Sequence, residues 1–135
     1  MEIIDLNEEQ VEDIETRLSS SDEKHFPYKM DGCIRIGVED DGKLIAGLDA
    51  CITSFKIPYV STVFVDEEYR RKGIGARMIR EMEKRAAAMG INTIRLDTFD
   101  WQGREFYEAL GYRCAGSYEN AEDGYSEFFF LKRIH

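Results

Sequence analysis

The sequence lacks any long apolar run. Its longest unbroken run of apolar residues has four members, as in Phe128 to Leu131, whereas a membrane-spanning helix needs about 20. The first residues also lack the basic and then apolar pattern of a secretion signal. We therefore expect neither a membrane protein nor a secreted precursor. With 135 residues, 43% of them hydrophobic, the chain predicts a single folded domain over residues 1–135.

Positive charge is scarce. The chain has 18 Lys and Arg against 27 Asp and Glu, which gives a formal net charge of −9. A surface of this balance repels nucleic acid and anionic lipid at long range, so we expect neither a nucleic-acid partner nor a membrane partner. The same surface attracts cations, including amines. Alternatively, the acidity serves only to keep a cytosolic protein soluble.

Cysteine is also scarce, and its spacing excludes the common metal sites. Cys33, Cys51 and Cys114 are far apart, with no Cys-x-x-Cys pair and no Cys/His spacing of a zinc site. We therefore expect no metal. The three cysteines are interpreted as small core residues of a cytoplasmic protein, because thiols stay reduced in that compartment.

Hydrophobic periodicity predicts a mixed α/β fold. It indicates helices at 8–18, 73–89 and 102–110, and strands at 2–5, 33–39, 44–53, 58–66, 91–98, 112–118 and 125–132. Strand 58–66, helix 73–89 and strand 91–98 form a central βαβ unit, whose two strands run parallel. Hairpins on either side of this unit predict a mostly antiparallel sheet of about six to seven strands with flanking helices.

A basic turn joins a strand to a glycine-rich helix start at residues 63–77. Arg70, Arg71 and Lys72 are three adjacent cations, and Gly73 and Gly75 follow them. A helix N-terminus has unpaired N–H groups that bind anions, and glycines let a ligand approach those groups closely. The pattern predicts a phosphate or pyrophosphate site. It is neither a Walker loop nor a dinucleotide fingerprint.

A second short motif, Phe106-Tyr-Glu-Ala-Leu-Gly-Tyr112, follows after the predicted helix and strand. Together with Arg70-x-x-Gly73-x-Gly75 it resembles the GNAT N-acetyltransferase superfamily, over about residues 33–132. The resemblance implies a GNAT-like fold. It also implies an acetyl-coenzyme A-dependent N-acetyltransferase whose acceptor is a primary amine, of a small molecule rather than of a protein. The alternative is a non-catalytic acyl-coenzyme A-binding module that senses or regulates.

The resemblance also implies roles for single residues. Strand residues 63–65 would bind the pantetheine arm through their backbone, the amides of residues 71–76 would bind the pyrophosphate, and Tyr107 would protonate the departing thiolate. Otherwise Tyr107 is only a core aromatic residue. The cofactor-binding residues implied in this way are Val63, Phe64, Val65, Arg70, Arg71, Lys72, Gly73, Ile74, Gly75 and Ala76.

Two positions depart from the family pattern, since Asp100 and Gly103 stand where many members have an Asn and an Ala. Asp100 stands where many members have an Asn that contacts the coenzyme. A carboxylate cannot donate the same hydrogen bond, and it repels phosphates. Trp101 or Gln102 would then take that place.

The acceptor amine must lose a proton before it attacks, since an ammonium of pKa ~10.4 has no lone pair. Asp49, His25 or an ordered water is the candidate general base. Asp49 interrupts an apolar strand and is otherwise a half-exposed residue, and His25 is otherwise an exposed loop residue. Phe128 to Phe130 in the last strand suggest a homodimer, unless all three are buried within one subunit.

Overall fold

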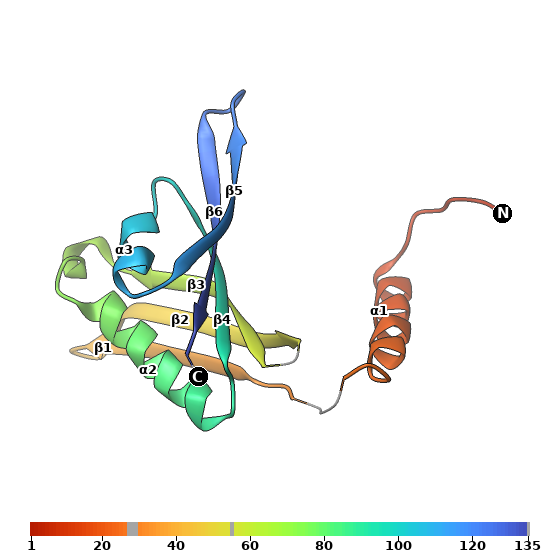
Figure 1. Cartoon of the computed structure of the whole chain (residues 1–135), viewed down its shortest axis with the longest axis horizontal. Helices are drawn as coiled ribbons and strands as arrows, with labels where there is room; N and C mark the ends of the chain where they lie inside the picture. The colour runs from red at the N-terminus through yellow and green to blue at the C-terminus, as the bar shows by residue number, and fades with distance from the viewer. Residues whose placement is uncertain (27–29, 55, 135) are drawn as a thin grey trace.

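The computed structural model describes residues 1–26, 30–54 and 56–134. Its elements are α1 (Glu8–Asp22), β1 (Cys33–Asp40), β2 (Lys43–Ser54), β3 (Ile57–Val65), the 3₁₀ turn η1 (Glu67–Tyr69), α2 (Ile74–Ala88), β4 (Thr93–Phe99), α3 (Arg104–Ala109), β5 (Arg113–Asn120) and β6 (Tyr125–Arg133). Figure 1 shows a twisted sheet with α2 and α3 against it, and α1 standing apart. Among the described residues, no helix combines the length and the apolar character that crossing a membrane requires.

The sheet has six strands in the order β1-β2-β3-β4-β6-β5. The β3–β4 pair is parallel and the other four pairs are antiparallel, which confirms the predicted βαβ unit and mostly antiparallel sheet. The predicted strand at residues 2–5 is wrong, because this segment has no regular secondary structure and pairs with no strand of the sheet. Helix α1 ends at Asp22 and not at residue 18, since the serines at 19–21 continue the helix.

The inner face of the sheet carries the core. One cross-strand row of this face consists of Ile34, Ala50, Val60, Leu96 and Phe130, which are aligned in the register and all buried. Four buried residues of α2 complete the cluster, namely Met78, Ile79, Met82 and Ala86. Because side chains alternate along a strand, the neighbouring row lies on the outer face and contains Cys33, Cys51, Tyr59, Arg95 and Leu131.

Strands β3 and β4 separate after a short contact. They pair only at Tyr59–Arg95 and Val60–Leu96, although β3 continues to Val65. The β2–β3 register shifts at this point, so that Ser61 has no partner of its own between Val60 and Thr62. A bulge of this kind increases the local twist of a strand. Among the described residues, β3 therefore has an unpaired edge toward β4 from Ser61 onward. Figure 1 shows the two strands diverging.

The interpretation of three core thiols is wrong. Cys33 and Cys51 are directly opposite each other in the β1–β2 pair and form a disulfide, while Cys114 is free and exposed. The sequence separates the two bonded cysteines by 18 residues, and only the hairpin register brings them together.

The three phenylalanines of β6 do not share one environment. Phe130 is fully buried in the core, Phe128 is half-buried, and Phe129 keeps 38% of its surface exposed on the outer face. The alternative in which all three are buried within one subunit is therefore wrong.

Candidate functional site

The start of α2 leaves its first backbone N–H groups open. The residue that caps the helix, Gly73, has no side chain to accept from them, and the first intrahelical bond is donated by the N–H of Arg77 to the Gly73 oxygen. Ile74, Gly75 and Ala76 thus present N–H groups without an intrahelical partner. These groups, with the positive end of the helix dipole, form an anion site.

The three cationic side chains before the helix differ in how far other groups of the protein already engage them. Arg70 is tied to the end of β3, because its Nε donates to the Val65 oxygen at 2.9 Å and its guanidinium lies over the Phe64 ring at 5.9 Å. Arg71 and Lys72 are exposed, and the Lys72 Nζ lies 5.3 Å from the centre of the Tyr69 ring. Arg71 and Lys72 are therefore the cations of this turn that remain available to an anion.

The two glycines of the motif are needed for different reasons. Gly73 has φ +80°, a conformation that other residues rarely adopt, and a Cβ added there meets nothing within 4 Å. A Cβ at Gly75 would lie 3.2 Å from Cζ of Phe106. Gly75 therefore allows α3 to pack on the first turn of α2, and this contact brings the two sequence motifs together in space.

The predicted pantetheine-binding residues lie on the separated part of β3. Val63, Phe64 and Val65 pair with β2 on one side and are past the last pair with β4 on the other. The Val65 oxygen already accepts from Arg70. The strand thus has backbone groups available on the side of β4, in the way that an added strand requires.

Tyr107 lies in the core, at the inner face. Its ring packs against Phe106, Tyr112 and Phe130, with ring centres 5.0, 5.8 and 6.3 Å away, and 8% of its surface is exposed. Burial raises the pKa of Tyr107 to about 12, so the phenol keeps its proton at neutral pH. The side chain is a protonated donor in an apolar environment.

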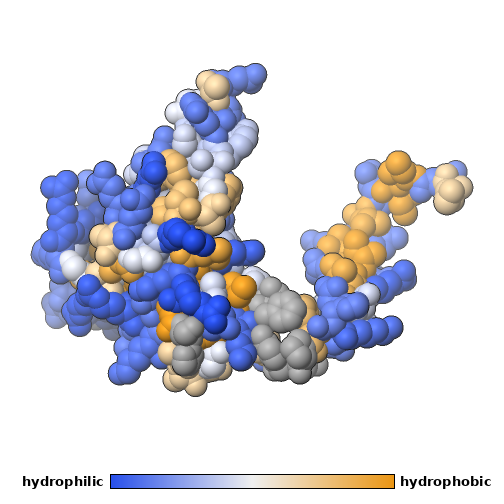
Figure 2. Space-filling model, viewed as in Figure 1, coloured by the Kyte–Doolittle hydropathy of each residue, from blue (hydrophilic) through white to orange (hydrophobic). Residues whose placement is uncertain are grey.

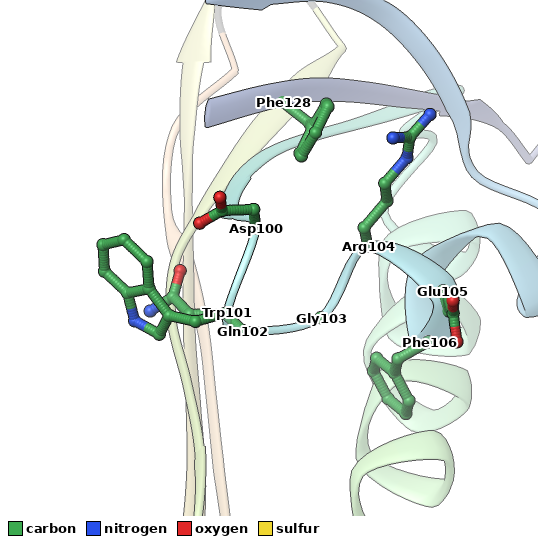
Figure 3. Close-up of a pocket in the computed structure, with 8 residues that line it drawn as sticks. All are labelled: Asp100, Trp101, Gln102, Gly103, Arg104, Glu105, Phe106 and Phe128. Carbon is green, nitrogen blue, oxygen red and sulfur yellow. The ribbon is translucent and has the colours of Figure 1, made fainter. Parts of the chain in front are cut away.

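A hollow of about 550 Å³ lies at the start of α3, between the turn after β4 and strand β6. Figure 3 shows Asp100 and Trp101 at one side of it, Phe106 at the other, and Arg104 beside Phe128. The Arg104 guanidinium lies 4.3 Å from the centre of the Phe128 ring. Asp100 thus lines the hollow as a carboxylate, at a position where the sequence departs from the family pattern.

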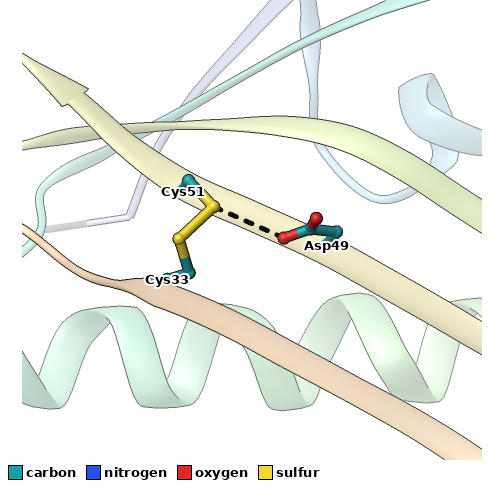
Figure 4. Close-up of side chains that lie close together, drawn as sticks. All are labelled: Cys33, Asp49 and Cys51. Carbon is teal, nitrogen blue, oxygen red and sulfur yellow. Dashed lines mark hydrogen bonds between the residues drawn. A yellow bond between two sulfur atoms is a disulfide. The ribbon is translucent and has the colours of Figure 1, made fainter.

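The candidate base Asp49 lies on the outer face of β2, opposite to the face of Tyr107. Its Oδ1 accepts from Arg35 Nε at 3.1 Å and lies 3.4 Å from Cys51 Sγ. Figure 4 shows Asp49 beside Cys51 and the disulfide. Cys33, Asp49 and Cys51 are the group of metal-type ligands found in the described part of the chain. Both sulfurs belong to the disulfide, so no thiolate is available for a metal there.

His25 is not brought to this site. It lies in the exposed turn after α1, where its N–H donates to the Asp22 oxygen, and α1 stands apart from the sheet in Figure 1.

Two side-chain clusters are not predicted by the sequence. Tyr112 donates to Glu83 Oε2 at 2.8 Å, and Lys132 Nζ donates to both oxygens of Glu83 and to the Leu110 oxygen. On the outer face, Tyr59 donates to Asp97 Oδ2 at 2.6 Å. These partners are 22 to 49 residues apart, so no local pattern indicates them.

Comparison with known proteins agrees with this geometry. Residues 2–112 match the model of the acetyltransferase (GNAT) family. Blasticidin-S acetyltransferase of Streptomyces morookaense is 30% identical over 94 residues, which cover 69% of this chain and 68% of that enzyme.

Solved structures extend the likeness to the whole chain. A crystal structure of an acetyltransferase from Bacillus cereus is similar with a TM-score of 0.91 and 27% identity, over 98% of this chain and 97% of that one. An aminoglycoside 6'-N-acetyltransferase complexed with coenzyme A is similar with a TM-score of 0.67 and 25% identity, over 76% of this chain and 73% of that one.

Proposed function

This chain belongs to the acetyltransferase (GNAT) family, and we propose that it transfers the acetyl group of acetyl-coenzyme A to a primary amine of a small molecule. The observation that carries this proposal is the contact between Gly75 and Phe106. It places the open helix start and the Tyr107 helix side by side, next to Val65 at the end of the unpaired part of β3.

The residues present fit the coenzyme. The pyrophosphate would be held by the N–H groups of residues 74–76 and by the exposed side chains of Arg71 and Lys72, since charge-assisted hydrogen bonds suit an anion. The space around Gly73, where a Cβ would meet nothing, leaves room for it. The unpaired β3 edge at Val63 to Val65 would bind the pantetheine arm, and acetyl-coenzyme A supplies the acetyl group as a thioester.

Tyr107 is the proposed general acid. Its hydroxyl would donate to the departing thiolate, and the raised pKa keeps the phenol protonated at neutral pH.

Asp49 and an ordered water are the proposed alternatives for the base. Asp49 would approach from the outer face, and its partner Arg35 fixes the orientation of its carboxylate. The exposed turn of His25 offers no support for a role as base.

The exposed surface and the net charge also bear on the partners of the protein and on its compartment. We propose a homodimer, because Phe129 is exposed in the terminal strand, and no nucleic-acid or membrane partner, because the net charge is −9. We propose the cytoplasm as the compartment, where a disulfide such as Cys33–Cys51 forms only transiently.

The test is release of coenzyme A thiol from acetyl-coenzyme A in the presence of polyamines, amino acids and aminoglycosides. We expect release that depends on one class of amine. The exposed thiol of Cys114 would react with a thiol reagent, so the Cys114→Ser variant serves as the assay protein. A protein that binds acetyl-coenzyme A and releases no thiol with any amine would support the non-catalytic module instead.

A further inference from the structure

Helix α1 carries an apolar stripe that the described part of the chain leaves uncovered. Val11, Ile14 and Leu18 follow one another at spacings of three and four, and therefore share one face of the helix. Their exposed fractions are 38%, 47% and 63%, and no residue of α1 is buried. Figure 2 shows orange side chains along this arm, apart from the body of the molecule. A helix of this length is marginal in water and depends on packing of its apolar face.

The chain as a whole exposes more surface than a compact monomer. Its accessible surface is 9961 Å², whereas a compact chain of 15.6 kDa exposes roughly 7,200 Å². The difference of roughly 2,700 Å² per chain, or about 5,400 Å² for two chains, is at the upper end of the area that obligate homodimers bury. The excess is the size expected of a subunit separated from its partner.

A groove of matching character lies between β1 and α2. Its volume is about 480 Å³. Half-buried Ile36, Val38 and Ile74 form an apolar floor. The exposed side chains of Arg80 and Lys84 stand at its rim, and neither has an ion pair among the described residues.

The charges of α1 complement this rim. The helix contains six acidic residues and one basic residue. Glu8, Glu12 and Glu15 lie along one side of the apolar stripe. An acidic amphipathic helix fits an apolar groove with a basic rim, in the helix-in-groove mode of recognition. Because the net charge of the chain is −9, most of its surface would repel the acidic helix, whereas the basic rim of this groove attracts it.

The likeness to a solved structure includes α1. The match with the Bacillus cereus crystal structure has a TM-score of 0.91 and covers 98% of this chain, so α1 lies within the matched part. An apolar helix that stands apart from its own sheet needs a cover from another molecule.

We propose that α1 of one chain packs into the β1–α2 groove of a second copy, and that the second copy returns the same contact. The protein is then a homodimer formed by exchange of N-terminal segments, with Val11, Ile14 and Leu18 of each chain on the apolar floor of the other. This interface is isologous, as closed dimers require.

Sedimentation of the full chain tests the interface without any assay of activity. We expect the wild type to sediment as a dimer at micromolar concentration. Ile14→Glu places a charge in the contact and should raise the dissociation constant at least about 100-fold. Thr16→Glu adds the same charge on the opposite face of α1 and should leave the dimer intact. Since α1 makes no buried contact with its own body, the sheet and α2 should stay folded in both variants, and near-ultraviolet circular dichroism should show this. A monomeric wild type, or an Ile14→Glu protein that still dimerises, would overturn the proposal.

A mixing experiment separates exchange from a helix that folds onto its own groove. Ile14→Glu damages the helix, and the double variant Arg80→Glu, Lys84→Glu damages the groove through two exposed side chains. Each should be monomeric alone. Mixed, they should form heterodimers, because the intact helix of one reaches the intact groove of the other. Two variants that remain monomers after mixing would show that each helix serves its own chain.

Discussion

At the scale of single residues, the question is whether Tyr107 protonates the departing thiolate. We expect Tyr107→Phe to lower kcat by about 10²–10³, the range for loss of one general acid, with coenzyme affinity unchanged because the ring and its packing remain. Steady-state kinetics with calorimetric binding would measure both. The loss should shrink with an acyl donor whose thiol leaves more easily. Turnover within a few-fold of wild type would make Tyr107 a core aromatic and leave the acetyltransferase function intact.

Gly73 offers a matched test of the pyrophosphate site. Gly73 and Gly42 both have φ +80°, and an added Cβ meets nothing within 4 Å at either. Gly73→Val and Gly42→Val therefore bring similar backbone strain. We expect only Gly73→Val to abolish the thermal stabilisation by acetyl-coenzyme A, which for wild type is ~2.7 kcal/mol at a hundredfold excess over Kd. Equal stabilisation of both glycine variants by acetyl-coenzyme A would show that the coenzyme binds elsewhere.

Arg71→Ala should weaken coenzyme binding only several-fold, since the backbone amides remain.

At the scale of elements, Glu83 of α2 connects the helix to the C-terminal part of the sheet. Tyr112 and Lys132 both donate to it, and the Glu83 and Lys132 side chains are 15% and 25% exposed. Tyr112→Phe leaves the Lys132 contact in place. We expect it to lower the free energy of unfolding by about 1.5–3 kcal/mol, the range for a hydrogen bond to a charged group, measured by urea denaturation against Tyr118→Phe at an exposed position.

The tyrosines also set the alkaline limit of stability. Burial and the Glu83 charge raise the pKa of Tyr112, burial raises that of Tyr107 to about 12, and the hydrogen bond to Asp97 raises that of Tyr59 to about 12. Folding thus favours the protonated phenols. Their contribution is complete below pH ~10, the unfolded pKa, and is lost as pH rises from there toward 12. In melting curves across this window, Tyr112→Phe should lose less stability than wild type.

At the scale of the whole molecule, the disulfide joins the two ends of the β1–β2 hairpin. A closed loop with a separation of 18 residues stabilises the folded state by about 3 kcal/mol in the chain-entropy description. We expect Cys33→Ser to lose about that amount under oxidising conditions, whereas Cys114→Ser should lose none. Reductant should destabilise wild type equally and leave Cys33→Ser unchanged. If the denaturation midpoint of wild type were the same with and without reductant, the disulfide would not make this contribution.

Local patterns determined much of the fold and the nature of the site. The alternation of Ile34 with Arg35 and the Asp41-Gly42 turn predict the first hairpin, and Gly73 and Gly75 predict the open helix start, because these signals act between near neighbours in the chain. The two motifs were sufficient to indicate acetyl transfer.

Only the tertiary structure decided which distant residues meet. The register of β1 and β2 turned two scattered cysteines into a disulfide. The same packing placed Asp49 and Tyr107 on opposite faces of the sheet and joined Glu83 to Lys132 across 49 residues. Residues 2–5 have the composition of a strand, and Val11, Ile14 and Leu18 that of a packed helix face, yet both segments are uncovered within the described chain. Hydrophobic spacing says that a face will be buried; which surface buries it depends on contacts between parts of the molecule that the sequence does not place side by side.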